Sequence, residues 1–178
     1  SANVRFIFTV HSLLSEDPFS KSRSSLLIEK LTYSGRQEII AVSKTVLEDY
    51  SRMIKIKGRS HVLYNYIEDD FFQQKPFAKA TKNILRLVAV GNLKEVKNYF
   101  FLLDLFTRLK SNPVTLDIYG SGPQYEELNA FIRMSKINVR LMGVRSDIIS
   151  VLPDYDAFVM ASLYEGFGIA LIEAMAVG

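Results

Sequence analysis

The stretch DYDAFVMASLYEGFGIALIEAMAVG, residues 154–178, decides the fold and the candidate site. It contains a short apolar run at 157–161, a loop with Gly166 and Gly168, and a helix-like run at 169–176. A strand, a glycine loop and a helix in this order are typical of a parallel α/β sheet, in which ligands bind beyond the carboxyl ends of the strands. Glu165 and Glu173 stand on the two sides of the junction between loop and helix.

The rest of the chain repeats this alternation. Helix-period segments lie between apolar runs, most clearly in NYFFLLDLFTRLK (98–110) and QYEELNAFIRMS (124–135). The apolar runs predict strands at 6–10, 39–42, 62–64, 84–90, 114–119, 137–142 and 157–161. We therefore expect an α/β protein with Rossmann-like parallel sheets and helices on both faces.

Residues 68–82 interrupt the alternation, because this segment is polar, contains Pro76 and has no clean period. We interpret it as a linker between two α/β units, 1–67 and 83–178. Both ends are interpreted as truncated: the start enters an apolar run almost at once, and the chain stops where a strand is expected after a helix.

Composition excludes several classes of protein. The 178 residues are 48% apolar and 23% charged, a balance typical of a globular protein with a buried core. Cysteine is absent and only two histidines occur, which excludes disulfides and thiolate metal sites and argues against structural zinc. The net charge of +3 is compatible with anionic small ligands or an anionic membrane surface. The basic residues are spread along the chain, so nucleic acid is not an expected partner.

The loop after 84–90 reads GNLKEVKN and leads into the first long helix. Lys97 stands at or just before the first turn of this helix, where a cation opposes the helix dipole. A bound phosphate would explain the position, because it accepts bonds from backbone N–H groups and from the ammonium. A solvated lysine offset by Glu95 is the alternative, and the pattern alone favours it.

Two further loops carry weaker signals. In GSGP after 114–119, Gly120 and Gly122 permit a tight turn and the close approach of a ligand, and Pro123 suits the first position of a helix. Turn formation alone also explains these residues. In GVRSD after 137–142, Ser146 is predicted to cap a helix, and Arg145 either reaches a ligand or is solvated.

The loop after 157–161 combines two kinds of binding group. The backbone N–H groups of Phe167, Gly168 and Ile169 are expected to point from a helix N-terminus, which favours an anion. The carboxylate of Glu173, in the second turn, could accept two hydrogen bonds from a diol, as the ribose-binding acid of dinucleotide-binding folds does. Each glutamate alone is explained as an ordinary helix residue or a favourable N-terminal charge, but the whole constellation indicates a ligand site.

Several segments together resemble one enzyme family. SLYEGFGIALIEAMAVG closely resembles the glutamate–seven–glutamate motif of retaining GT-B glycosyltransferases of family 4 (group 1). LRLVAVGNLKEVKN and LDIYGSGPQYEEL resemble the same family's glycine–lysine and GxGP segments, with Gly91 and Lys97 at the matching positions. Three segments of the first unit resemble the same family less closely: EIIAVSKTVLEDY, HVLYNYIEDDFF and FTVHS.

The resemblance implies roles for these residues. Glu173 would bind the nucleotide ribose, Glu165 would contact the donor sugar with the backbone at 166–169, and Lys97 would neutralise the diphosphate leaving group. His11 would lie near the reacting centre. Residues 1–67 would be part of the acceptor-side domain and 83–178 the nucleotide-sugar-binding domain. The implied partners are a nucleotide-sugar donor and a glycan or lipid-linked acceptor, without metal or other cofactor.

The sequence also departs from the family pattern. Asn92 replaces the arginine that often follows the first glycine, so that one of two cations for the diphosphate is lost unless Lys94 or Arg145 substitutes. Such enzymes are roughly twice this length. We therefore expect an inactive fragment that carries most of the donor-binding loops.

Asp154-Tyr155-Asp156 matches the DxD pattern that binds a metal in some glycosyltransferases. It precedes its strand, at the end of the sheet opposite the ligand crevice. We predict that Asp156 orients the strand entry and that no metal binds there.

Two alternative functions are a non-catalytic nucleotide-binding module and a GT-B nucleotide-sugar epimerase. Epimerases lack the EGFGxxxxEAMA form, which disfavours them. The expected location is the cytoplasm, with peripheral contact at the inner face of the membrane, in the synthesis of surface polysaccharide or glycoconjugate.

Overall fold

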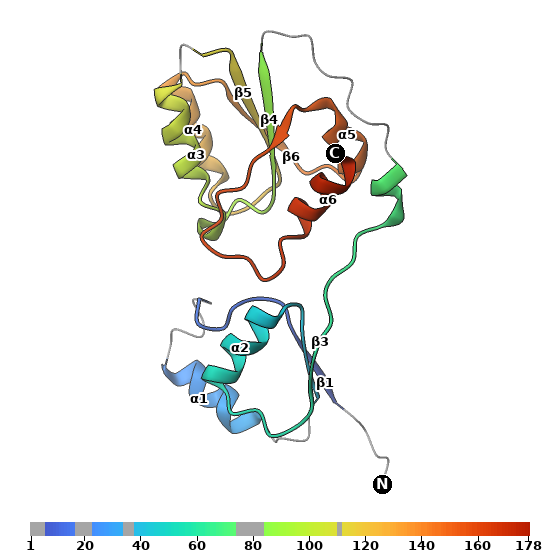
Figure 1. Ribbon diagram of the computed structural model, residues 1–178. Helices are drawn as coiled ribbons and strands as arrows, with labels where there is room; N and C mark the ends of the chain where they lie inside the picture. The colour runs from blue at the N-terminus through green and yellow to red at the C-terminus, as the bar shows by residue number, and fades with distance from the viewer. Residues whose placement is uncertain (1–5, 17–22, 34–37, 74–83, 110–111) are drawn as a thin grey trace. The chain divides into compact units, whose positions relative to one another are not determined.

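A computed structural model describes residues 6–16, 23–33, 38–73, 84–109 and 112–178. The chain divides into two compact units (Figure 1). Unit 1 comprises Ser1–Tyr66 together with Tyr164–Gly168, and unit 2 comprises Ile67–Leu163 together with Ile169–Gly178. The loop Tyr164–Gly168 therefore packs with unit 1, although its neighbours on both sides in the chain belong to unit 2.

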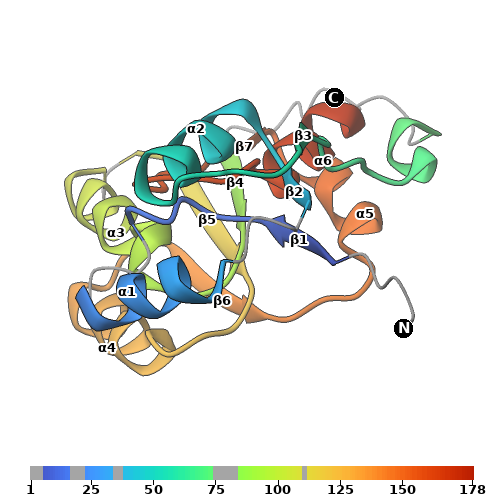
Figure 2. The ribbon, with the colours of Figure 1, turned by 90° about the horizontal axis from the view of Figure 1, so that it is seen from below.

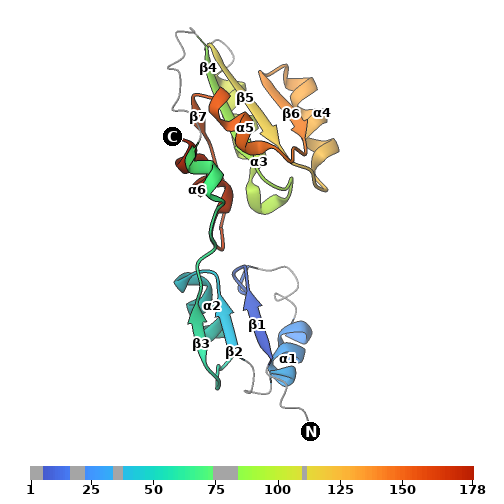
Figure 3. The ribbon, with the colours of Figure 1, turned by 90° about the vertical axis from the view of Figure 1, so that its right-hand side faces the viewer.

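Unit 1 is built on a parallel sheet in the order β1-β2-β3, with α2 behind the strands in Figure 3. Its elements are β1 (Ile7–Val10), α1 (Arg23–Thr32), β2 (Glu38–Ala41), α2 (Lys44–Met53) and β3 (Ser60–Val62). Ser43 begins α2 as an N-cap, because its hydroxyl accepts a bond from the Val46 amide at 3.2 Å. The core joins Ile39 and Ala41 of β2 to Val46 and Tyr50 of α2.

Unit 2 holds a four-stranded parallel sheet in the order β6-β5-β4-β7. Its strands are β4 (Leu85–Val90), β5 (Val114–Tyr119), β6 (Val139–Gly143) and β7 (Ala157–Phe158). Its helices are η1 (Asp69–Gln73), η2 (Glu95–Lys97), α3 (Tyr99–Arg108), α4 (Tyr125–Ser135), α5 (Ile148–Val151), η3 (Leu152–Asp154) and α6 (Ile169–Val177).

Helices cover both faces of the unit 2 sheet. On one face α3 and α4 lie side by side (Figures 1 and 2), and Leu103 and Leu128 pack with Leu116 and Ile118 of β5. On the other face η1, α5, η3 and α6 pack around Val88 of β4. The prediction of Rossmann-like parallel sheets with helices on both faces is confirmed for this unit. None of the described helices is long and apolar enough to cross a membrane.

Three predicted strands are misplaced, and one of them, predicted at 137–142, occupies Val139–Gly143. The strand predicted at 62–64 occupies Ser60–Val62. Its partner β2 ends at Ala41, where the chain turns into α2, so that pairing stops soon after Val62. The last bond to β2 is from the Leu63 amide to the carbonyl of Ala41. The strand predicted at 157–161 ends at Phe158. After the bond from the Val159 amide to Val88, the chain leaves β4, and the Leu163 amide donates to the carbonyl of Val96 instead.

The interpretation of 68–82 as a linker is wrong over its first part. Asp69–Gln73 forms the 3-10 helix η1, and its Phe71 is buried in the same core as Val88 and Val177. Residues 74–82 lie outside the described residues.

Two predicted helix starts are also wrong. Pro123 precedes α4 by two residues, because a turn closed by the bond from Tyr125 to Gly122 comes first, and Gln124 is the N-cap. Asp147, not Ser146, is the N-cap of α5, and its carbonyl accepts a bond from the Ser150 amide.

Candidate functional site

The loops after β4 and β5 run against each other with bare backbone at the carboxyl end of the sheet. The Gly91 amide donates to Tyr119, and the Leu93 amide donates to Ser121, each at 2.9 Å. A Cβ added at Gly120 would collide with the carbonyl of Gly91, and one added at Gly122 would lie 2.5 Å from the carbonyl oxygen of Leu93. These glycines are therefore required by the close approach of two loops, which is more than turn formation alone explains.

Lys97 is the last residue of the short helix η2, and its side chain lies close to Gly91. A Cβ at Gly91 would be 3.1 Å from Lys97 Cε and 3.4 Å from its Nζ. The residue is half-buried, in contrast to the solvated lysine that the sequence pattern favoured. The next residue, Asn98, has a left-handed backbone (φ 53°) and serves as the N-cap of α3. Lys97 thus places a cation at the carboxyl end of β4, beside Gly91.

Two other residues predicted to flank the ligand, Arg145 and Asn92, are more exposed than Lys97. Arg145 makes a bidentate ion pair with Asp147, with N–O distances of 2.7 and 2.6 Å, and both side chains are exposed. The hydrogen bonds from Arg145 hold the pKa of Asp147 well below its usual range. The guanidinium of Arg145 is thus engaged by its neighbour. Asn92, in the first loop, is exposed.

Glu173 lies in the second turn of α6, as predicted, and it is half-buried. Burial raises the pKa of its carboxyl, and the negative charge of Glu68 adds to this effect. Gly168, directly before the helix, has a φ of 77°, a conformation that favours glycine. The helix therefore begins where the sequence placed it.

Unit 1 holds the other end of the motif. A Cβ added at Gly166 would collide with the carbonyl of His11, so that this glycine is needed for the loop to lie against the His11 segment. The rings of Phe167 and Tyr64 are 6.0 Å apart. Within unit 1 the fold therefore brings the loop that carries Glu165 together with His11, while Gly91, Gly120, Gly122, Lys97, Arg145 and Glu173 belong to unit 2.

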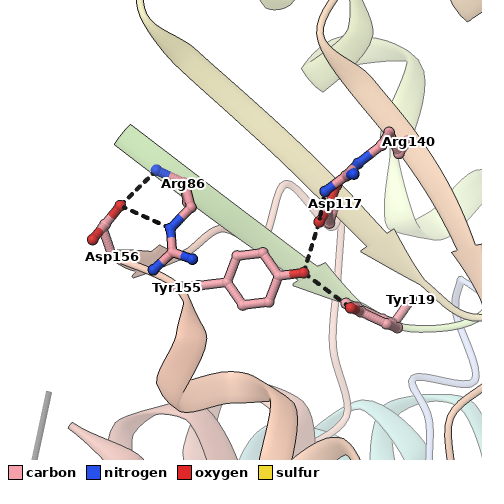
Figure 4. Close-up of polar contacts among 6 residues, drawn as sticks. All are labelled: Arg86, Asp117, Tyr119, Arg140, Tyr155 and Asp156. Carbon is pink, nitrogen blue, oxygen red and sulfur yellow. Dashed lines mark hydrogen bonds and ion pairs between the residues drawn. The ribbon is translucent and has the colours of Figure 1, made fainter. Parts of the chain in front are cut away.

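The sequence reasoning missed a buried polar network in unit 2 (Figure 4). Asp117, on β5, is 3% exposed and accepts two bonds from the guanidinium of Arg140 at 2.7 and 2.6 Å. The Tyr155 hydroxyl donates to Asp117 at 2.7 Å and is 2.9 Å from the hydroxyl of Tyr119. An aspartate in the middle of the apolar run VTLDIY was the available signal, since a buried carboxylate needs partners.

The predicted role of Asp156 is confirmed. Its carboxylate accepts a bond from the Arg86 amide at 2.6 Å (Figure 4). The Asp156 amide in turn donates to the carbonyl of Arg86. These bonds join the start of β7 to β4. In the described part of the chain, no group of three or more histidine, aspartate or glutamate side chains is placed to hold a metal.

Comparisons with known proteins point to one family. Residues 85–178 match the family described as glycosyl transferases group 1. An N-acetylgalactosamine-N,N'-diacetylbacillosaminyl-diphospho-undecaprenol 4-alpha-N-acetylgalactosaminyltransferase of Campylobacter jejuni is 29% identical over an alignment of 165 positions that covers 89% of this chain and 45% of the relative. The GtfA subunit of a UDP-N-acetylglucosamine–peptide N-acetylglucosaminyltransferase of Streptococcus agalactiae is 40% identical over 76% of this chain and 27% of the relative.

Solved structures agree on the fold. The structure of HepE from Anabaena in complex with UDP-glucose matches with a TM-score of 0.80 and 21% identity, over 97% of this chain and 51% of that one. The chain spans about half or less of the length of these relatives. Over half of its residues match the family, and its parallel sheets and motif loops are those expected from the resemblance, so the chain belongs to the glycosyl transferases group 1.

Proposed function

We propose that this chain is the donor-binding part of a retaining glycosyltransferase. The whole enzyme would move a sugar from a nucleotide-sugar to a glycan or lipid-linked acceptor. The observation that carries the proposal is the Lys97 ammonium beside Gly91, in two glycine loops that pack closely at the carboxyl ends of β4 and β5. A cation beside a glycine at this place suits a diphosphate, because parallel α/β sheets bind ligands beyond the carboxyl ends of their strands.

In this proposal unit 2 binds the nucleotide. Lys97 neutralises the negative charge that grows on the diphosphate as the bond to the sugar breaks, which is where a positioned cation lowers the barrier most. Glu173 accepts hydrogen bonds from the two ribose hydroxyls. Its raised pKa fits a partly desolvated carboxylate that gains from such donors. Asn92 and Arg145 flank the diphosphate from the loops after β4 and β6.

The glutamate loop of the motif serves the sugar. The resemblance implies that Glu165 contacts the donor sugar, with the backbone N–H groups of Phe167, Gly168 and Ile169 as further donors, and that His11 lies near the reacting carbon. Support comes from the packing of the Glu165 loop against the His11 segment. Because lysine and backbone groups supply the positive charge, we propose that the reaction needs no metal or other cofactor.

The acceptor and location are proposed from the relatives. One relative is named for an acceptor on diphospho-undecaprenol, a lipid carrier. We propose synthesis of a surface polysaccharide or glycoconjugate in the cytoplasm, with peripheral contact at the inner face of the membrane. The net charge of +3 is compatible with an anionic surface.

We also propose that the chain by itself binds nucleotide without transferring sugar, because it spans 45% or less of the two curated relatives described above. In that respect its own behaviour is that of a nucleotide-binding module. Sugar transfer is a property to be tested in the full-length parent protein, with donor and acceptor both present.

The test is a titration of the chain with UDP, GDP and ADP by ligand-observed NMR, together with Lys97→Ala and Glu173→Ala. The matched control is Arg133→Ala, since Arg133 is an exposed cation in the last turn of α4, at the opposite end of the sheet. We expect one nucleotide to bind, and each site variant to weaken it about tenfold or more, since a hydrogen bond to a charged group contributes about 1.5–3 kcal/mol. The Arg133→Ala variant should bind as the original chain does.

Equal loss in all three variants, or no loss in either site variant, would refute the assignment of Lys97 and Glu173. Absence of binding by a folded chain would refute the donor site itself for this chain.

A further inference from the structure

The segment Tyr164–Gly168 is attached to unit 1 at three points that surround Glu165. On one side, the Tyr164 hydroxyl donates a hydrogen bond to the carbonyl of Glu16 at 3.1 Å, across 148 positions of sequence. On the other side, Gly166 lies against the carbonyl of His11, and the ring of Phe167 lies 6.0 Å from that of Tyr64.

The receiving carbonyl of Glu16 is itself held in place. It belongs to the turn at residues 14–16, and the next amide back, that of Ser15, donates to the carboxylate of Asp49 at 3.0 Å. Asp49 lies on α2 and is 4% exposed, so its carboxylate is placed by the core of the unit. A buried carboxylate with a backbone partner is a firm anchor, since leaving it unpaired is costly. Asp49 of α2 thus holds the turn at residues 14–16, and the carbonyl of Glu16 in this turn accepts the bond from Tyr164.

We propose that Tyr164 is a positioning residue that fixes Glu165 against the His11 segment of unit 1. The inference rests on the proposed function, in which Glu165 contacts the sugar of the donor. It adds that Tyr164 is one of the residues that hold the Glu165 loop within unit 1, whereas Glu173 lies on α6 in unit 2. Nothing in the spacing of the two glutamates would indicate this division.

The division has a measurable consequence. Loss of the Tyr164 hydroxyl leaves α6, Lys97 and the glycine loops unchanged, so it should leave binding of the bare nucleotide unchanged. It removes one of the three attachments of the loop that carries Glu165, so it should weaken the additional binding that the sugar provides. A residue with a purely structural role would lower both affinities together, or neither.

The experiment compares UDP with UDP-glucose and UDP-N-acetylglucosamine by calorimetric titration of the chain and of Tyr164→Phe. The matched control is Tyr33→Phe, because the Tyr33 hydroxyl also bonds backbone in unit 1, accepting from the amides of Lys57 and Gly58 at 3.1 Å, away from the loop. We expect Tyr164→Phe to lower the affinity for the better nucleotide-sugar about threefold to tenfold, the range of one hydrogen bond, and to change UDP affinity less than twofold. Tyr33→Phe should change neither the affinity for the nucleotide-sugar nor the affinity for UDP.

A second readout does not depend on binding. Amide hydrogen exchange of residues 165–168 should become faster in Tyr164→Phe and stay unchanged in Tyr33→Phe, whereas exchange in α6 should stay unchanged in both.

The outcomes separate the two proposals. If the chain binds UDP and Tyr164→Phe lowers the affinities for UDP and nucleotide-sugar equally, or lowers neither, the positioning role is overturned and the donor site stands. If the chain binds no nucleotide, the proposed function fails, and exchange at 165–168 then decides whether Tyr164 fixes the loop. Unchanged exchange there overturns the inference in every case.

Discussion

Replacement of Gly120 by alanine tests whether the two loops of unit 2 require bare backbone. The added Cβ would collide with the carbonyl of Gly91, and the loops cannot separate without breaking the bonds of Gly91 to Tyr119 and of Leu93 to Ser121. Overpacking costs about 1–3 kcal/mol, and a non-glycine residue at a φ of 143° costs about 1–3 kcal/mol more. The sum of about 2–6 kcal/mol is a large part of the stability of a typical domain, about 5–15 kcal/mol.

Gly143→Ala is the matched control, because Gly143 also has a positive φ (76°) but nothing lies within 4 Å of an added Cβ. Gly143→Ala should lower the free energy of unfolding only by the cost of a non-glycine residue at positive φ, about 1–2 kcal/mol. The assay is urea unfolding, monitored by hydrogen exchange in the peptide that contains β5. This peptide reports on unit 2 separately from unit 1. If Gly120→Ala is no less stable than Gly143→Ala, close approach of the loops does not explain the glycine.

Three further changes test other parts of the structure. Burial and Glu68 raise the pKa of Glu173, so its contribution to stability is present at low pH and is lost as the pH rises through the folded-state pKa. Glu173→Gln should therefore melt at a higher temperature than the original chain at neutral pH, with a difference that disappears in acid; a constant difference would contradict the assigned cause. Tyr155→Phe removes bonds to both Asp117 and Tyr119 and should destabilise unit 2 by about 1–3 kcal/mol in urea unfolding, more than Tyr119→Phe, which removes one; the reverse order would show that Asp117 does not depend on Tyr155. Ser43→Ala removes the N-cap of α2 and should cost unit 1 about 0.5–2 kcal/mol, measured as faster exchange in α2, and unchanged exchange would show that the cap bond is not significant.

Much of the fold was predictable because its signals are local. The run at 114–119 became β5 with the predicted bounds, and the segments at 98–110 and 124–135 became α3 and α4. Helical and strand periods depend on residues two to four positions apart, so that a single sequence carries them. Strand ends were less predictable, since β7 stops where its partner no longer runs beside it.

The candidate site was predictable only in part. The motif from Glu165 to Glu173 identified a loop and a helix, and Lys97 was placed correctly before α3. The pattern favoured a solvated lysine, however, because nothing near Lys97 in the sequence shows that its side chain lies over Gly91. Asp117 was missed for the same reason, since Arg140 and Tyr155 are far from it in sequence.

The sequence by itself determined the class of fold, the family and the residue types in each loop, because these depend on local periodicity and on one contiguous motif. Only the tertiary structure decided which glycines are required by backbone-to-backbone approach, that Lys97 lies beside Gly91, and that the Glu165 loop packs with unit 1 while Glu173 stays with unit 2. The physical reason is that these features arise from contacts such as Tyr164 with Glu16, 148 positions apart, and contacts over such separations leave no periodic trace in the chain.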